Sequence, residues 1–546
     1  MRLDKRRWIP AFAGMTDGNG IGNGEQQGQG QGRGQGEKPV IPAKAEIQCR
    51  SAAVTRWILV FLATPVLLLS VTTALSAQAS PSLDPDHWAV AAARRAEALG
   101  LVEGYLPSER SVSREVVAEA LAEAAASAGD EWPQYLPLLK AWQARFAEEF
   151  GAVGEAWDGL ALLSGSGQIG YRARDGAAAP GLAEFPPERT GALPLEDRSD
   201  LLVGANLAAA IGDHLVVAAE PRASLDEFYD SEWEIVAGWR RLSASIGRQP
   251  VGYGYGVGGG VLLSGAVPIN RIEIETSQSV ILPGILRYAG PFALHLFFGE
   301  MDDDRHPADP FIWGARASIR PHPRFTASAS RAGFFGGNRS DRPVTFGNIF
   351  NMLLGRVEGG SFENQLFSAE FRYRLPTERV IPATVYLEWG MEDAAGAIRD
   401  VPGRVMGIWV PAVPGVPALA VGYENASFAE SCCGNPEWYR HQAFPGSWSG
   451  TEVPLGHPLG GHGTESLVYA TLDLLESRLR VQGDTFWRDR GSENLYVPGR
   501  AGESSGFSIE LAGRVTSNAE VELVWSRESG DGWAENRFRT AARMFF

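Results

Sequence analysis

Three histidines share a glycine- and proline-rich stretch of the chain with several aromatic residues. His441, His457 and His462 carry imidazole nitrogens, which are common zinc ligands, and two or three of them together could bind a zinc ion. Zinc-binding segments place their ligands at short, recurrent spacings, and these histidines match none of them. The sequence therefore predicts no metal site.

The run Asp302-Asp303-Asp304 offers carboxylate oxygens that could hold a hard cation. Arg305 and His306 follow it directly. A solvated acidic loop is the simpler interpretation, so we assign no cation and no cofactor to this run.

Catalytic motifs are the next candidates, and residues 254–259 match the dinucleotide pattern G-x-G-x-x-G. That pattern works at a turn between a strand and a helix, but here the chain runs into Pro268. The glycines are better explained by a tight, aromatic-rich bend. Eight histidines and 65 acidic residues offer many acid–base combinations, and no signature such as G-x-S-x-G favours one. We therefore assign no catalytic residue and expect no enzyme.

Cysteine is rare in this chain. Cys49 lies near the N-terminus, and Cys432 and Cys433 are adjacent. An adjacent pair is neither a disulfide framework nor a metal-ligand spacing. A vicinal disulfide, an inter-chain link and two loop cysteines without a role all stay open.

The last ten residues, 537–546, alternate strictly between two faces. One face carries apolar or small residues, including Phe538, Met544 and the terminal Phe546, and the other carries arginines such as Arg539. A transmembrane barrel strand accommodates both faces, because its apolar side meets lipid and its polar side meets a wet lumen. The alternative is an amphipathic edge strand of a soluble sandwich. A terminal aromatic is typical of outer-membrane proteins, and we expect the barrel assembly machinery to recognise it.

The same period of two runs from about Leu163 to the end. Sixty-five glycines, 16 tryptophans and a mean hydropathy of −0.13 fit apolar residues spread over alternate positions, which excludes a polytopic helical membrane protein. Division of the roughly 385 remaining residues by the twenty or so typical of one strand and its loop gives about 16 to 20 strands. We predict an all-β fold, a large antiparallel transmembrane β-barrel of about 18 strands over residues 159–546.

A small α-helical segment is expected before the barrel, over residues 80–158. The apolar residues there recur at helical spacing and predict three helices of about ten to fifteen residues. About seventy residues make a thin core, so this segment should lean on the barrel. The expected helix signals are an N-cap at Ser111 or Ser113, stops at Gly100 and Gly129, and a start at Pro137.

Residues 54–79 have the layout of a signal peptide. An apolar core from Trp57 to Leu69 follows Arg56, and small residues precede an expected cleavage before Ser80. A retained membrane anchor is the alternative, which Pro65 weakens. Residues 1–53 include a Gly/Gln-rich stretch whose flanks resemble translated intergenic repeats, so we expect translation to begin near Val54. The whole leader, 1–79, is set aside from the fold.

Charge narrows the range of partners. The chain has a formal charge of −16, and residues 1–79 hold nine Lys+Arg and five Asp+Glu, so residues 80–546 carry −20. Such a charge does not suit nucleic acid or anionic lipid. Any anionic partner would also need a local positive patch or bridging cations. Four arginines could form either a cationic cluster or a row that points down the lumen. They are Arg316, Arg320, Arg324 and Arg331.

Ten short motifs follow one another between about residues 240 and 463. They are Gly247-Arg248-Gln249, Leu262 to Pro268, Phe298 to Arg305, Gly314-Ala315-Arg316, Ser330-Arg331-Ala332, Asn364 to Arg374, Glu388 to Asp393, Tyr423-Glu424-Asn425, Trp438 to His441 and Gly456 to Gly460. Their order resembles the capsule assembly Wzi family of outer-membrane proteins. The segment 80–158 also resembles the helices of that family, whereas its W-G-P-G site appears here as residues 251–254, a difference that bears on glycan specificity.

The resemblance implies an outer-membrane barrel of a Gram-negative bacterium, with periplasmic helices at its opening and outer-membrane lipid around it. It further implies a lectin-like, non-catalytic anchor for capsular or extracellular polysaccharide. Aromatic faces and fixed polar groups bind sugars, and the candidate loop residues are Trp438, Tyr439, Arg440, His441 and Trp448. The same residues could instead form an aromatic girdle at the membrane interface. A porin-like diffusion channel is the alternative function, and an outer-membrane hydrolase is a weaker one.

Overall fold

The computed structural model describes residues 79–106, 112–129, 132–151, 159–176, 199–224, 228–239, 241–301, 308–354, 361–392, 402–428, 438–441, 443–450, 453–497 and 499–546. The chain divides into two units, Met1–Thr73 and Ala74–Phe546, and all described residues belong to the second. The predicted signal peptide and translation start lie outside the described residues, as do Cys432, Cys433 and the run from Asp302 to His306.

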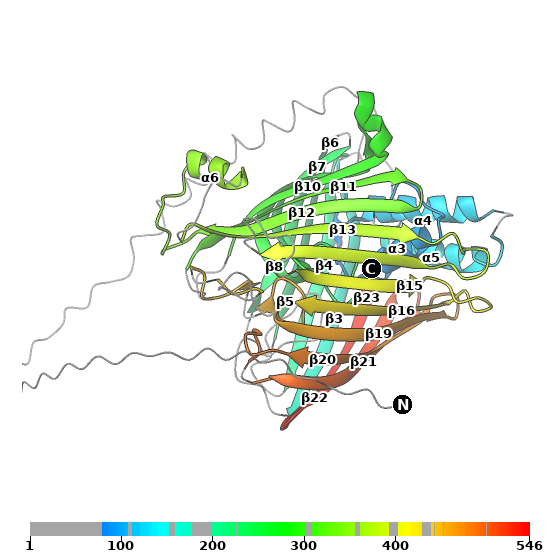
Figure 1. The fold of residues 1–546 in the computed structure, drawn as a ribbon. Helices are drawn as coiled ribbons and strands as arrows, with labels where there is room; N and C mark the ends of the chain where they lie inside the picture. The colour runs from blue at the N-terminus through cyan, green and yellow to red at the C-terminus, as the bar shows by residue number, and fades with distance from the viewer. Residues whose placement is uncertain are drawn as a thin grey trace, which may run out of the picture. The chain divides into compact units, whose positions relative to one another are not determined.

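Within the described residues, eighteen antiparallel strands close into a barrel, and a two-residue strand pairs with one of them (Figure 1). The last strand pairs with the first, with Phe545 opposite Ser166. The predicted 18-strand antiparallel barrel is therefore confirmed. The strands are β3 Leu160–Gly176, β4 Ser199–Ile211, β5 Leu215–Ala223, β6 Phe228–Trp239, β7 Leu242–Gly252, β8 Ser264–Thr276, β9 Val280–Ile281, β10 Pro291–Glu300, β11 Pro310–His322, β12 Phe325–Gly336, β13 Glu363–Arg374, β14 Thr384–Glu392, β15 Gly403–Val410, β16 Leu419–Phe428, β19 Gly463–Leu474, β20 Leu479–Arg490, β21 Gly502–Thr516, β22 Ala519–Gly530 and β23 Trp533–Phe545.

The two faces of each strand differ as the alternation predicts. On β23, Phe538 and Met544 are 41% and 60% exposed on the outer surface. Arg539 pairs with Glu522 of the neighbouring strand and borders a cavity inside the barrel. Apolar groups therefore point outward and charged groups point into the lumen, which is the arrangement of a barrel surrounded by lipid.

The two ends of the barrel have different connections. At one end, which we call the short-turn end, strands are joined by short turns such as 212–214 and 517–518. At the other, the long-loop end, the connections include 337–362 and 429–462. The long loops contain α6 (Phe346–Leu353) and the two-stranded pair β17 (Ser449–Gly450) and β18 (Val453–Pro454). Short turns are typical of the periplasmic side of outer-membrane barrels.

Three helices lie together at the short-turn end (Figure 1). They are α3 (Trp88–Ala98), α4 (Arg114–Ala128) and α5 (Leu136–Phe150), and a two-stranded pair, β1 (Ser82–Leu83) and β2 (Val112–Ser113), flanks them. The Ser113 side chain caps α4 by accepting from the backbone N–H of Val116 at 3.4 Å. Among the described residues, no helix is both long and apolar enough to cross a membrane.

The helices share one core and use the barrel as its other wall. Leu121 and Trp142 are buried at the centre of this core, which also includes Ala412 from the turn between β15 and β16. Gly129 ends α4 with a φ of 36°, in the left-handed region that favours glycine. A 3-10 helix, η1 (Gly284–Ala289), lies on the connection between β9 and β10 at the same end.

Candidate functional site

Two chain segments fold into the lumen from the long-loop end. One is 253–263, between β7 and β8, and the other is 438–462, between β16 and β19. We call the described residues of these two segments the plug. They belong to one buried core together with strand residues such as Ile312, Phe334 and Val405. The G-x-G-x-x-G match is thus a bend inside the barrel, and Gly254 there has a φ of 104°. A side chain at Gly254 would lie 2.4 Å from a carboxylate oxygen of Glu388.

Carboxylates on the inner wall bind the backbone of the plug. Glu424 on β16 accepts from the N–H groups of Val257 and Gly258 at 2.7 and 2.8 Å, and from the Tyr386 hydroxyl at 2.6 Å. Glu388 on β14 accepts from the N–H of Val261 at 2.9 Å. These contacts supply the hydrogen bonds that a buried carboxylate requires. The first plug segment is therefore fastened to the wall at two points.

The aromatic residues of the predicted sugar site are buried in the plug. Trp438, Tyr439 and Trp448 are 1%, 0% and 0% exposed. The indole N–H of Trp448 donates to the carbonyl of Leu262 at 2.7 Å, and the Tyr439 hydroxyl donates to the carbonyl of Val261 at 2.6 Å. Tyr439 and Trp448 thus join the two plug segments, and all three side chains are buried in this structure.

The two polar members of the predicted set lie closer to solvent. Arg440 and His441 are half-buried. The Arg440 guanidinium donates to the carbonyls of Glu493 and Asn494 at 2.7 and 2.8 Å, which ties the plug to the connection between β20 and β21. His441 accepts through Nδ1 from the N–H of Ala443 at 3.2 Å.

The three histidines considered for zinc do not form a group of close ligand atoms among the described residues. His457 is buried, with Nε2 4.0 Å from one carboxylate oxygen of Glu424 and 4.0 Å from one of Glu465. Of the described residues, Glu273, Glu275 and His295 are the group with ligand atoms within 4.8 Å of one another. Arg271 donates to Glu273 at 2.6 Å, and the Tyr253 hydroxyl lies 2.7 Å from His295 Nδ1, so hydrogen bonds already occupy these atoms.

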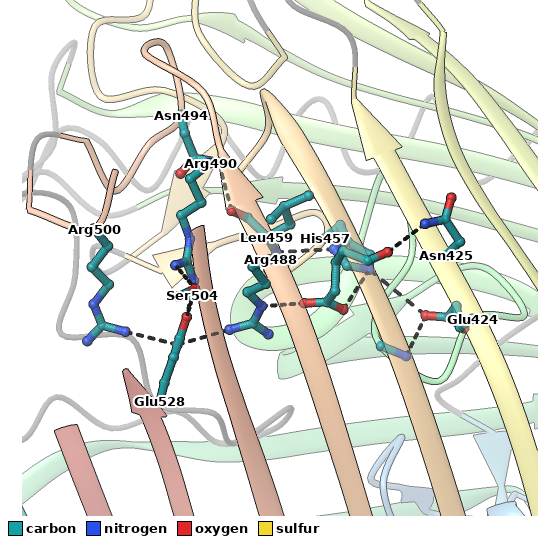
Figure 2. Close-up of polar contacts among 12 residues, drawn as sticks. Glu424, Asn425, His457, Leu459, Arg488, Arg490, Asn494, Arg500, Ser504 and Glu528 are labelled. Atoms are coloured by element: carbon teal, nitrogen blue, oxygen red, sulfur yellow. Dashed lines mark hydrogen bonds and ion pairs between the residues drawn. The ribbon is translucent and has the colours of Figure 1, made fainter. Parts of the chain in front are cut away.

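A chain of ion pairs continues from His457 along the inner wall. Figure 2 shows side chains from neighbouring strands pointing toward one another across this wall. Arg488 pairs with Glu465 and, at 3.1 Å, with Glu528, which also receives Arg490 at 2.9 Å. The network crosses β19, β20 and β22 and therefore stiffens the wall beneath the plug.

At the short-turn end the helices are fastened by buried arginines. Arg95 of α3 pairs with Asp473 at 2.7 Å, and Arg145 of α5 pairs with Glu520 at 2.7 Å. Burial lowers the pKa of Arg95 to about 10, with the nearby Asp473 opposing that change. A guanidinium with this pKa stays charged at neutral pH, so the contact is an ion pair under physiological conditions.

Glu149 is a buried carboxylate of the helical segment with a lowered pKa. Burial by itself raises its pKa, but the charge and hydrogen bond of His87 and the hydrogen bond of Trp88 lower it to about 2. The indole N–H of Trp88 donates to Glu149 at 2.9 Å, and His87 Nε2 lies 3.1 Å from the other carboxylate oxygen. This group joins the start of α3 to the end of α5.

Two cavities inside the described barrel border the helices. One, of about 220 Å³, is lined mainly by charged residues such as Arg539, and the other, of about 150 Å³, has aromatic side chains such as Tyr386 and Tyr469. Asp86 and Arg480 border both. Protein therefore occupies part of the described lumen at the short-turn end and at the long-loop end.

The four arginines that were considered as a cationic cluster lie apart in the structure. Arg316 and Arg320 point into the lumen and pair with Glu370 and Glu97. Arg324 lies at the short-turn end, and Arg331 reaches the carbonyls of α6. The structure therefore does not bring them together as one patch.

The comparisons with known proteins agree with this architecture. A family model described as capsule assembly protein Wzi matches residues 228–532. The structure of Wzi from Escherichia coli, described as an outer membrane protein involved in group 1 capsule assembly and a carbohydrate-binding β-barrel, matches with a TM-score of 0.64 and 18% identity, over 84% of this chain and 98% of that one. No curated protein matches the sequence.

Two barrels from Pseudomonas aeruginosa are similar at a lower level. OpdQ matches with a TM-score of 0.44 and 8% identity, over 70% of this chain and 97% of its own. OpdL matches with a TM-score of 0.43 and 13% identity, over 71% of this chain and 98% of its own. Similarity at this level supports no functional argument.

Proposed function

The chain belongs to the family of the capsule assembly protein Wzi, and from this premise we propose that it anchors or helps assemble capsular or extracellular polysaccharide at the cell surface. The family resemblance predicted from the sequence is confirmed by the same match. In this proposal the protein is a lectin-like, non-catalytic barrel in the outer membrane, exported by its signal peptide and surrounded by outer-membrane lipid.

The observation that carries the proposal is that protein occupies the described lumen at both ends. A diffusion channel needs a continuous aqueous path, whereas here the plug packs inside the long-loop end and α3, α4 and α5 pack at the short-turn end. The plug is held by hydrogen bonds to buried carboxylates and the helices by buried ion pairs. A fixed closure suits a protein that holds a long polymer outside the cell better than one that passes solutes.

Burial also argues against a hydrolase. Glu424, His457 and Glu465 have residue types that could perform acid–base chemistry, but all three are at most 3% exposed. A polysaccharide chain would have to displace the plug to reach them. We therefore propose that this cluster supports the plug and binds no substrate.

Polysaccharide would contact the surface above the plug. Arg440 and His441 are the members of the predicted set that lie nearest to solvent. Trp438, Tyr439 and Trp448 would act from beneath by holding that surface in place. We also propose that the barrel assembly machinery recognises the final strand, which ends in Phe546.

The test compares polysaccharide attached to cells with polysaccharide released into the medium, in a deletion strain and in its complemented parent. The anchor predicts a shift from attached to released with unchanged total synthesis. Complementation with an Arg440→Ala/His441→Ala double variant should give a partial shift, and a Ser492→Ala variant on the neighbouring exposed loop should behave like the parent. Unchanged attachment in the deletion strain would refute the proposal, and ion conductance of the purified barrel would then test the channel.

A further inference from the structure

The helix α6 carries a row of apolar side chains that are about half exposed. Phe346, Phe350 and Leu354 are 44%, 49% and 48% exposed. Residues four apart lie on the same side of a helix, so these three form one continuous strip. Ile349 and Met352 are 8% and 0% exposed and lie against the protein. One face of the helix therefore packs against the protein, and another face presents an apolar strip.

The contacts of α6 place it on the outer surface of the barrel. On β12, Ser330 points into the lumen, where its hydroxyl accepts from Arg316 at 2.6 Å. Successive strand residues point to opposite faces, so Arg331 points outward. Its guanidinium donates to the carbonyls of Leu353 and Met352 at 3.0 and 3.4 Å. A cation at the C-terminal carbonyls of a helix is favourable, and here it holds that end of α6 against the outer wall.

The strand register sets the height of this contact. Arg331 lies opposite Phe367 on β13. Phe367 and Phe371 are exposed apolar residues on the outer face of that strand. On the same face, Gln365 and Glu363 follow toward the long-loop end and are polar. The end of α6 is therefore attached where the apolar outer band of the barrel gives way to polar residues.

We propose that α6 is an interfacial helix whose apolar strip inserts among the acyl chains of the outer leaflet. The strip continues the band that the barrel offers to lipid, and Arg339 and Arg342 precede the helix, where they can meet anionic headgroups. In water, three neighbouring large apolar side chains would be unfavourable. The inference rests on the proposed placement of the barrel in the membrane. Its consequence is that the loop between β12 and β13 is held down on the membrane surface, beside the plug.

Spin labels can test this in the full-length protein reconstituted in phosphatidylethanolamine–phosphatidylglycerol vesicles. The three native cysteines are replaced by serine, and single cysteines are introduced as Phe346→Cys and Phe350→Cys. Phe371→Cys on the barrel wall serves as the lipid reference, and Ser492→Cys on an exposed loop as the aqueous reference. Power saturation compares collision with oxygen, which partitions into lipid, with collision with a water-soluble nickel chelate.

We expect both α6 labels to follow the lipid reference, with a ratio of oxygen to nickel collisions several-fold above that of the aqueous reference. If Phe371→Cys follows lipid but both α6 labels follow the aqueous reference, the inference is overturned while the barrel stays in the membrane. If both α6 labels are shielded from both reagents, another protein surface covers the strip, which also overturns it. If the Phe371→Cys label itself does not show the collision ratio of a lipid-exposed site, the proposed membrane placement is refuted, and the inference that rests on it is refuted too.

Discussion

Replacement of Glu97 by glutamine should loosen the helices from the short-turn end of the barrel. Glu97 is buried in α3, and its carboxylate pairs with Arg320 at 2.7 Å and with Arg372. Removal of one partner from a buried ion pair costs about 3–5 kcal/mol, because the remaining charge stays buried without compensation. Arg320 keeps hydrogen bonds to the carbonyls of Glu103 and Tyr105 at 2.7 and 2.8 Å, so we expect the lower end of that range.

A loss of about 3 kcal/mol corresponds to roughly a hundredfold rise in the population of detached helices. Hydrogen exchange of the α3 amides in the micelle-bound, full-length protein measures this population, and it should speed up about a hundredfold while exchange in the barrel strands stays unchanged. Glu103→Gln is the matched control, because Glu103 is exposed and follows the same helix. Equal protection of α3 in the Glu97→Gln variant and in the control would refute the assignment of this ion pair as a fastening.

Two further predictions follow from the closure of the barrel. The pKa of Glu149 is about 2 in the folded protein, below its ordinary value of 4.5, so its contribution of about 3 kcal/mol is complete above pH 4.5 and is lost as the pH falls toward 2. Protection factors of the α5 amides should decrease over this range, and Glu149→Gln should abolish the decrease; a decrease that survives in the variant would contradict this assignment. Replacement of Trp448 by alanine removes a buried side chain and its 2.7 Å bond to Leu262, at a cost of about 3–5 kcal/mol. We expect conductance steps in planar bilayers for Trp448→Ala and none for the parent; steps of equal size from both would show that the plug does not close the lumen.

The architecture of the wall could be predicted because its signals are local. In β23, outward Phe538 and inward Arg539 are neighbours in the chain, and the period of a strand alone places them on opposite faces. The N-cap at Ser113 and the stop at Gly129 are also decided within a few residues. Such patterns repeat over many strands and three helices, and so a barrel of about 18 strands with a small helical segment followed from the sequence.

The family assignment also came from the sequence, through the order of motifs that the family match over residues 228–532 confirms. The sequence evidence for the candidate sugar residues was weaker, because aromatic residues in a loop can cover a core as readily as they can contact a ligand. Trp438 illustrates the difficulty: a side chain at Gly403, on β15, would lie 2.6 Å from its ring. Nothing in the sequence around Gly403 indicates that this glycine leaves space for the Trp438 ring.

The sequence by itself determined which segments form strands and helices and which face of a strand points outward, because these properties depend on residues close together in the chain. Only the tertiary structure decided that the lumen is plugged. Trp448 bonds to Leu262 across 186 positions of sequence, and Val261 bonds to Glu388 across 127. Closure of the barrel brings these partners together, and neither the glycine-rich bend nor the aromatic loop reveals its partner until the strands between them have been placed.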